Sequence, residues 1–173
     1  MSTLLIRKVS FKDISDLQKI CKQTFLETYA AGNTEEDMHK YLEEEFADGK
    51  LKLELNDNDS EFYFAILDNK VIGYIKINFG ESQTEIKDKK ALEIQRIYVL
   101  KDFQGKRIGK ALYQKAVEIA RQKGLEYLWL GVWEENPKAI QFYEKIGFVA
   151  FDKHIFQLGT DAQTDIMMKI KLN

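Results

Sequence analysis

The strongest constraint on the fold is the order in which strand-like and helix-like hydrophobic patterns follow one another along the chain. Seven segments have the pattern of a strand, namely 3–9, 61–67, 71–79, 91–99, 125–133, 148–158 and 164–172. Four segments carry apolar residues at helical spacing, namely 13–29, 34–46, 111–124 and 137–146. Because adjacent hairpins mix with helical crossovers, this order predicts a mixed α/β (α+β) sheet with helices on both faces, and not a fully parallel sheet.

Length and composition favour one domain spanning residues 1–173. The chain has no internal repeat, no low-complexity segment and no linker rich in Pro, Gly or Ser. No apolar run approaches the roughly 20 residues that cross a bilayer, and Arg7 and Lys8 interrupt the apolar N-terminus as no signal peptide would allow. The single cysteine, Cys21, cannot form an internal disulfide. These features predict a cytoplasmic protein.

Charge is distributed unevenly although the whole chain has a net charge of only −2. Residues 27–48 contain eight acidic residues and one lysine, a net charge of −7, whereas residues 101–123 have a net charge of +5. The first segment favours a cationic ligand and the second an anionic one. The basic segment lacks the interleaved aromatic residues that stack on bases, so no nucleic-acid partner is expected. Two histidines and one cysteine without clustered spacing predict no metal site.

The segment "DFQGKRIGK", residues 102–110, joins a predicted strand to a predicted helix. Three residues separate Gly105 from Gly109 and Ala111 follows Lys110, so this is neither a Walker loop nor a G-x-G-x-x-G loop. A short loop before a helix still presents backbone N–H groups and the positive end of the helix dipole. Together with Lys106 and Arg107, these groups predict an anion site.

A second motif, "NPKAIQFYEKIGF", occupies residues 136–148. On a helix that begins at Pro137, one face carries Ala139, Phe142, Tyr143 and Ile146. The apolar members of this stripe are expected to pack in the core. The phenol of Tyr143 differs because a buried hydroxyl needs a partner, and it can also donate a proton to a leaving group.

Together, the two motifs resemble the GNAT superfamily of acyl-CoA-dependent N-acetyltransferases. In that family a loop of pattern Q/R-x-x-G-x-G/A binds the pyrophosphate of coenzyme A, and N-x-x-A-x-x-F-Y-x-x-x-G-F lines the pantetheine and the thioester. The second pattern is complete here, from Asn136 to Phe148. The first aligns at Gln104, Arg107 and Gly109, with Arg107 in place of the first glycine. The resemblance implies the GNAT fold, a mostly antiparallel seven-stranded sheet with splayed central strands, and acetyl-CoA as co-substrate.

The resemblance also implies the residues that bind the co-substrate. They are Ile97, Tyr98, Val99, Gln104, Gly105, Lys106, Arg107, Ile108, Gly109, Lys110, Asn136, Lys138, Ala139 and Tyr143. Backbone N–H groups near Tyr98 and Val99 would polarise the thioester carbonyl, Asn136 would bind the pantetheine, and Tyr143 would protonate the leaving thiolate. Because only Gly109 keeps a glycine in the loop, Arg107 is predicted to lie at φ < 0 in the first helical turn, with its N–H facing the phosphate.

A narrower resemblance links the chain from about Phe25 to Leu172 to the PaiA-like bacterial spermidine/spermine N-acetyltransferases. It rests on segments such as "LEIQRIYVLKDFQGK", "WLGVWEENPKAIQFY" and "KHIFQLGTDAQTD". It implies a polyamine acceptor that attacks the acetyl group directly in a ternary complex, with no membrane partner, and it makes a homodimer one expected assembly. Two alternatives stay open: acetylation of protein N-termini or lysines, and a non-catalytic acyl-CoA-binding regulatory module.

An amine acceptor must lose a proton before it attacks, since a free alkylamine has a pKa of about 10.4. The resemblance points to Glu93, six residues before Val99, as the general base, and Glu134 at the end of the next strand is the second choice. Glu93 has the alternative role of a cross-strand partner for Arg96 or a lysine. Glu27 and Tyr29 are expected to bind the polyamine, again with Glu93. His154 and the segment from Gln163 to Asp165 receive no predicted role.

Overall fold

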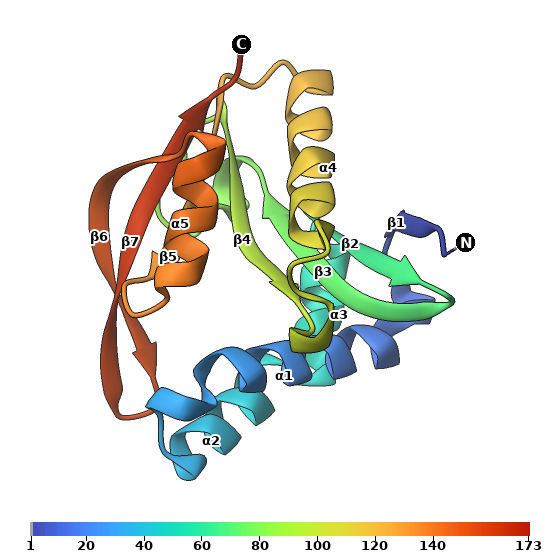
Figure 1. Ribbon diagram of the computed structural model, residues 1–173, viewed down its shortest axis with the longest axis vertical. Helices are drawn as coiled ribbons and strands as arrows, with labels where there is room; N and C mark the ends of the chain where they lie inside the picture. The colour runs from blue at the N-terminus through green and yellow to red at the C-terminus, as the bar shows by residue number, and fades with distance from the viewer. Residues whose placement is uncertain (1) are drawn as a thin grey trace.

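The computed structural model describes residues 2–173, and its seven strands form one mixed sheet (Figure 1). The strands are β1 (Leu4–Lys8), β2 (Ser60–Leu67), β3 (Lys70–Asn78), β4 (Ala91–Val99), β5 (Tyr127–Trp133), β6 (Val149–Leu158) and β7 (Asp161–Lys171). They lie in the order β1-β2-β3-β4-β5-β7-β6. Among the strand pairs of the described residues, only β4 and β5 run parallel. The predicted mixed and mostly antiparallel sheet is therefore confirmed.

Helices cover both faces of this sheet, as predicted. They are α1 (Ile14–Tyr29), α2 (Glu35–Glu45), α3 (Asp48–Asn56), α4 (Ile108–Gln122) and α5 (Pro137–Ile146). In Figure 1, α4 and α5 lie in front of the strands, and α3 lies behind β2 and β3. None of the helices within residues 2–173 is long and apolar enough to cross a membrane.

The sequence pattern did not predict α3. This helix contains Gly49 and has a single fully buried residue, Leu51, so it lacks the apolar stripe by which a surface helix is recognised. Its Glu54 is instead held by charged groups of the sheet. By contrast, α1 and α4 were predicted because each buries a stripe at helical spacing, such as Leu17, Ile20, Cys21, Thr24 and Phe25 in α1.

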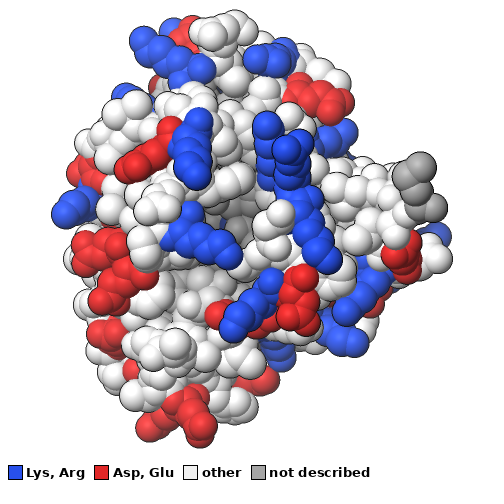
Figure 2. All heavy atoms as spheres, in the orientation of Figure 1, with Lys and Arg blue, Asp and Glu red and all other residues white. Residues whose placement is uncertain are grey.

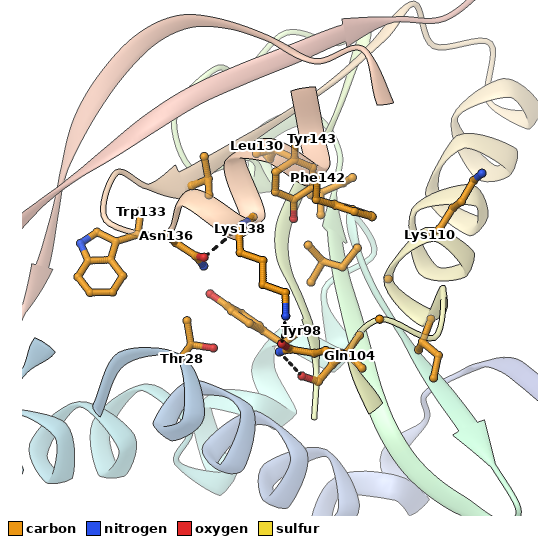
Figure 3. Close-up of a pocket in the computed structure, with 18 of the residues that line it drawn as sticks. Thr28, Tyr98, Gln104, Lys110, Leu130, Trp133, Asn136, Lys138, Phe142 and Tyr143 are labelled. Carbon is orange, nitrogen blue, oxygen red and sulfur yellow. Dashed lines mark hydrogen bonds between the residues drawn. The ribbon is translucent and has the colours of Figure 1, made fainter. Parts of the chain in front are cut away.

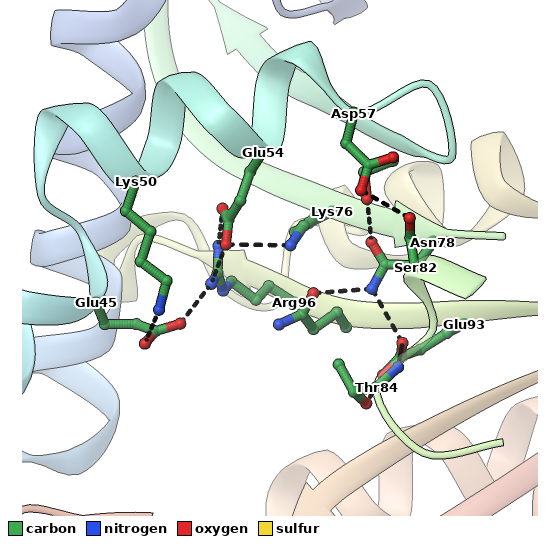
Figure 4. A network of polar contacts seen from close by, with 12 residues as sticks. Glu45, Lys50, Glu54, Asp57, Lys76, Asn78, Ser82, Thr84, Glu93 and Arg96 are labelled. Carbon is green, nitrogen blue, oxygen red and sulfur yellow. Dashed lines mark hydrogen bonds and ion pairs between the residues drawn. The ribbon is translucent and has the colours of Figure 1, made fainter. Parts of the chain in front are cut away.

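A buried ionic network joins α2 and α3 to the centre of the sheet (Figure 4). The guanidinium of Arg96 contacts Glu54 at 3.2 Å and Glu45 at 3.0 Å, and the amine of Lys76 lies 3.2 Å from Glu54. Burial alone would raise the pKa of the Glu54 carboxyl, but the positive charges of Arg96 and Lys76 outweigh it and hold this pKa below its usual value. The network thus fixes α3 on the sheet.

The two central strands separate halfway along their length. β4 and β5 pair only where Ala91–Ile94 faces Tyr127–Leu130. Lys76 pairs with Arg96 and Ile77 with Ile94, so Gln95 is an extra residue in β4, and such a bulge bends its strand. Beyond this point the backbone of β4 has no strand partner on its β5 side. The predicted splay is confirmed, and it opens a passage through the sheet.

Candidate functional site

A cavity of about 440 Å³ fills the opening between β4 and β5. Its walls come from the ends of both strands, from the loop before α4, from the first turns of α5 and from the end of α1 (Figure 3). Because α1 and α4 pack on opposite faces of the sheet, the cavity connects the two faces. Figure 2 shows a hollow at the middle of the front face with Lys and Arg side chains on both sides of it.

The front end of the cavity is built to hold an anion. The basic side chains of Arg107, Lys110 and Lys138 line it. Within residues 2–173, no protein acceptor receives a hydrogen bond from the backbone N–H groups between Gly105 and Lys110. The side chain of Gln104 closes the base of this end, since it donates to the carbonyl of Val99 at 3.2 Å and accepts from Lys138 at 3.1 Å. Free N–H groups, a helix N-terminus and lysine and arginine side chains are the usual components of a phosphate site.

The backbone of Arg107 contradicts its predicted conformation. Arg107 has φ 64° and ψ 17°, which is left-handed, and it precedes the first residue of α4 as its N-cap. The loop also holds Gly105 at φ 80°. Left-handed residues in a short turn direct backbone N–H groups toward one side, where an anion can collect them. The position therefore requires the conformation that glycine adopts without strain, and it is the position at which the family pattern has its first glycine.

We expect the Arg107→Gly variant to be more stable than the wild type by about 1 kcal/mol, because a left-handed L-residue costs about 1–2 kcal/mol and glycine gives back only part of this as chain entropy. The same variant should bind coenzyme A more weakly, since it loses a cation of the anion site. Denaturant unfolding and calorimetric titration measure the two effects. The matched control is Lys106→Gly, where φ is not positive; equal loss of stability in both variants would contradict the strain at Arg107.

The α5 wall contributes two polar groups from the second sequence motif. The Oδ1 of Asn136 caps α5 by accepting from the N–H of Ala139 at 3.2 Å, so its Nδ2 group is left to donate into the cavity. The ring of Tyr143 packs between Phe142 and Phe148, and its hydroxyl points into the cavity (Figure 3). Burial, followed by the neighbouring Tyr98, raises the pKa of Tyr143 well above its usual value. This phenol therefore stays protonated at neutral pH and can serve as a proton donor.

Aromatic residues surround the opposite end of the cavity, next to α1. The hydroxyl groups of Tyr29 and Tyr98 lie 3.4 Å apart, and the ring of Tyr29 lies 5.1 Å from the ring of Trp133. All three residues line the cavity. Tyr29 therefore lines this end of the cavity, and its contact with an acceptor stays a prediction.

The three predicted carboxylates do not line the cavity. Glu93 is buried, and its oxygens accept from Asn78 at 2.9 Å and from the backbone and hydroxyl of Thr84 (Figure 4). Glu27 accepts from the backbone N–H of Lys101 at 3.2 Å. Glu134 is exposed beyond the end of β5. Roles for these residues in proton transfer or substrate binding stay predictions, and Glu93 makes none of the contacts with Arg96 that were its alternative.

The cavity brings together the residues predicted for the co-substrate, with one exception. Lys106 does not line it, and its amine lies instead 5.2 Å from the ring of Phe103. The sequence analysis had assigned Phe142 only to the core and had omitted several lining residues, namely Thr28, Ile94, Gln95, Phe103, Leu130, Gly131, Val132 and Trp133. The lining residues on β5 could have been predicted from the expected splay, because the edge of β5 becomes exposed where β5 separates from β4.

Across residues 2–173, no group of three or more His, Cys, Asp or Glu side chains is arranged to hold a metal ion. The single cysteine, Cys21, is buried in α1 away from the cavity lining, and its burial raises the pKa of the thiol to about 11.

The sequence matches known proteins over nearly its whole length. The profile of the Acetyltransferase (GNAT) family matches residues 18–148. An uncharacterized N-acetyltransferase in the pepI 3' region of Lactobacillus delbrueckii subsp. lactis is 41% identical over 169 residues, which cover 98% of either chain. A spermidine N(1)-acetyltransferase of Thermoplasma acidophilum is 30% identical over 168 residues, which cover 95% of either chain.

The fold also matches solved structures over nearly the whole chain. The crystal structure of the PaiA N-acetyltransferase from Thermoplasma acidophilum in complex with coenzyme A superimposes with a TM-score of 0.81. The superposition covers 98% of this chain and 99% of that one, at 26% sequence identity. The ribosomal-protein-S18-alanine N-acetyltransferase from Escherichia coli has the same fold, with a TM-score of 0.72 at 15% identity.

Proposed function

This chain belongs to the GNAT acetyltransferase family, and from that premise we propose that it transfers the acetyl group of acetyl-CoA to a primary amine of a linear polyamine such as spermidine or spermine. The observation that carries the proposal is the cavity through the splayed sheet. It joins an anion site at one end to an aromatic, polar end beside α1, and the Tyr143 hydroxyl lies between them. Co-substrate and acceptor can therefore meet inside the sheet from opposite faces.

The residues at the front of the cavity fit coenzyme A. Its pyrophosphate needs several donors in a small space, and the free N–H groups before α4 supply them together with Arg107, Lys110 and Lys138. Its amide-containing arm needs donors along a narrow slot, which the Nδ2 of Asn136 and the unpaired edges of β4 and β5 offer. The thioester supplies an acetyl group that is activated for transfer to nitrogen.

The proposed reaction forms one bond and breaks one. The amine nitrogen forms a bond to the acetyl carbonyl carbon, and the carbon–sulfur bond breaks. Tyr143 gives a proton to the departing sulfur, and unpaired N–H groups of β4 near Tyr98 and Val99 stabilise the carbonyl oxygen. The nitrogen must release its own protons to the protein or to water. The predicted bases Glu93 and Glu134 do not line the cavity, and their roles stay predictions.

Two findings support a polyamine as the acceptor. A relative of similar length carries the name spermidine N(1)-acetyltransferase. A second, open cavity of about 480 Å³ lies where η2 (Ala30–Gly32) and the start of α2 meet the turn between β6 and β7, and it is lined by Asp37 and Asp161. The exposed carboxylate of Asp161 in this cavity suits the second ammonium group of a long cation.

A homodimer belongs to the same proposal. β6 is the last strand of the sheet, so one of its edges carries no strand partner in the described chain. Val149 and Ile155 on this strand are 66% and 65% exposed. Light scattering of the purified protein measures the assembly directly.

The proposal is tested by following free thiol while the protein is mixed with acetyl-CoA and one acceptor at a time. The acceptors are spermidine, spermine, butylamine, a peptide with a free N-terminus and a lysine peptide. We expect the largest kcat/KM with the polyamines. Release with peptides but not with polyamines would contradict the acceptor class. No release above the acceptor-free rate with any compound would contradict the transferase activity and favour the non-catalytic acyl-CoA-binding module.

A further inference from the structure

His154 and Asp165 form a polar pair on the face of the sheet that α1 and α2 cover. They lie directly opposite each other on β6 and β7 in the register of the sheet. The Nε2 of His154 is 3.6 Å from the Oδ2 of Asp165, which is too far for a hydrogen bond. Among residues 2–173, the Oδ1 of Asp165 and the Nδ1 of His154 are buried without a hydrogen-bond partner. Buried polar atoms of folded proteins normally have a hydrogen-bond partner, so these two atoms are candidates for contacts with a ligand or with water.

The pair adjoins the cavity at Gly131. Gly131 lines the cavity, and a methyl group at this position would lie 3.1 Å from the Cε1 of His154 and 3.4 Å from the Oδ2 of Asp165. The absence of a side chain on Gly131 therefore lets the pair approach the wall of the cavity. Asp165 also faces Trp133 across β5 and β7, and Trp133 lines the acceptor end.

The carboxylate of Asp165 is surrounded mainly by tyrosine hydroxyl groups, which are neutral. The titratable groups around it are His154 from β6, Tyr29 from α1, Tyr41 from α2 and Tyr98 from β4. Burial raises the pKa of Asp165, and His154 only partly offsets this effect. Burial, with the charge of Asp165 as a further cause, raises the pKa of both Tyr29 and Tyr98. The carboxylate therefore lacks a fixed cation but has a proton affinity above that of an exposed aspartate.

The same face of β7 leads from Asp165 to the second cavity. Residues 161, 163 and 165 point to one face because side chains alternate along a strand. Gln163 is 7% exposed, its Oε1 is buried without a partner, and its Nε2 donates to Asn33 at 2.6 Å and to Asp161 at 2.9 Å. Asn33 and Asp161 line the second cavity. Four residues of strand place Asp161 about 13 Å from Asp165, a span comparable with the length of extended spermidine.

We propose that Asp165 and His154 form the subsite that receives the reacting ammonium group of the acceptor and takes its proton, and that Asp161 receives the ammonium group at the other end. This inference rests on the proposed amine acetylation. The buried Oδ1 of Asp165 and the Oε1 of Gln163 provide acceptors for an ammonium N–H, and the pair lies against Gly131 in the cavity wall, next to Trp133 at the acceptor end. The ammonium N–H bond breaks, its proton passes to the Asp165 carboxylate or the His154 imidazole, and the lone pair stays on nitrogen for the attack.

The experiment compares wild type, Asp165→Asn and Asp161→Asn, with Asp152→Asn as the matched control. Asp152 lies on β6 and is exposed, so its variant has the same charge change at a position outside both cavities. For each protein, kcat/KM for spermidine and for butylamine is measured between pH 6 and pH 10, with the Kd for coenzyme A and the thermal unfolding midpoint.

We expect Asp165→Asn to lower kcat/KM for both amines about 10²-fold at pH 7. The deficit should shrink as the pH rises toward about 10.4, where the free amine loses its proton without help. Coenzyme A binding and thermal unfolding should match the wild type, since an unpaired carboxylate does not hold the fold together. Asp161→Asn should raise KM for spermidine several-fold and leave KM for butylamine unchanged, because butylamine has no second ammonium group.

Three outcomes would overturn the inference. In the first, Asp165→Asn retains the kcat/KM of Asp152→Asn. In the second, it loses the same factor at every pH and also unfolds at a lower temperature, which would make the pair structural. In the third, Asp161→Asn affects spermidine and butylamine equally, which removes the distal subsite. In each of these cases wild-type turnover of amines persists, so the proposed function stands; a wild type that acetylates no amine overturns both.

Discussion

The Tyr143→Phe variant is expected to lose about 10²-fold or more in kcat, the lower end of the usual contribution of a positioned general acid. The phenol points into the cavity, and its raised pKa keeps it protonated at neutral pH. Phenylalanine retains the ring contacts with Phe142 and Phe148, so only the proton donor is removed. The Kd for coenzyme A, measured by calorimetry, should stay within about a factor of two because the anion site is distant from this hydroxyl.

Tyr113→Phe is the matched control for this variant. Tyr113 also packs edge-on against Phe148, with ring centroids 5.8 Å apart, but it lies on α4 outside the cavity lining. Its variant should keep wild-type kcat. If Tyr143→Phe turns over spermidine as fast as Tyr113→Phe does, the sulfur takes its proton from another group and the role of Tyr143 is confined to packing.

The Arg96→Met variant is expected to lower the free energy of unfolding by about 3–5 kcal/mol, since removal of one partner leaves buried charges uncompensated. Arg96 is 7% exposed and contacts both Glu45 and Glu54. Without it, the Glu54 carboxylate keeps only Lys76 as a cationic partner. For a protein of this size the loss corresponds to a fall in melting temperature of roughly 10 °C, which differential scanning calorimetry measures.

The Arg7→Met variant tests whether burial of the ion pair is the cause of this loss of stability. Both arginines contact a carboxylate and lie over a phenylalanine ring, Phe46 for Arg96 at 5.2 Å and Phe64 for Arg7 at 5.6 Å. The side chain of Arg7 is 41% exposed, so its pair with Asp13 should contribute at most about 1 kcal/mol. Equal destabilisation by the two variants would show that the aromatic contact, and not the buried network, is what Arg96 contributes. A second change, Glu54→Gln, should restore part of the stability of Arg96→Met.

Local sequence was informative where a function depends on consecutive residues. The motif from Asn136 to Phe148 predicted the helix and the buried Tyr143, because helical spacing and a Pro at the first position are local properties. The loop from Gln104 to Lys110 was predicted as an anion site for the same reason. The prediction for this loop was wrong in one dihedral angle. The lack of a glycine at Arg107 suggested φ < 0, whereas the turn holds Arg107 at φ 64°.

Contacts between distant segments were not predictable from local sequence. Glu93 was chosen as a base from its position in β4, but the loop between β3 and β4 folds over it and Thr84 occupies its oxygens. Within the acidic stretch 27–48, Glu27 and Tyr29 were expected to bind the amine, and these roles stay predictions; Glu45 turns toward Arg96 and Glu43 toward Lys22. The pair of His154 and Asp165 received no role, since nothing in either neighbourhood indicates that β6 and β7 place them over Gly131.

The sequence by itself determined the order of the strands and of every helix except α3, and it determined the anion loop and the position of Tyr143. Hydrophobic period, turn residues and helix caps act over a few neighbouring residues, which is why they can be read locally. The tertiary structure alone decided which carboxylates are free. A carboxylate in the core accepts hydrogen bonds or ion pairs from any cation or N–H donor within reach. Which donors lie within reach depends on which strands and helices meet. Here the sheet gives partners to Glu54 and Glu93, whereas within residues 2–173 the Oδ1 of Asp165, beside the cavity, has no hydrogen-bond partner.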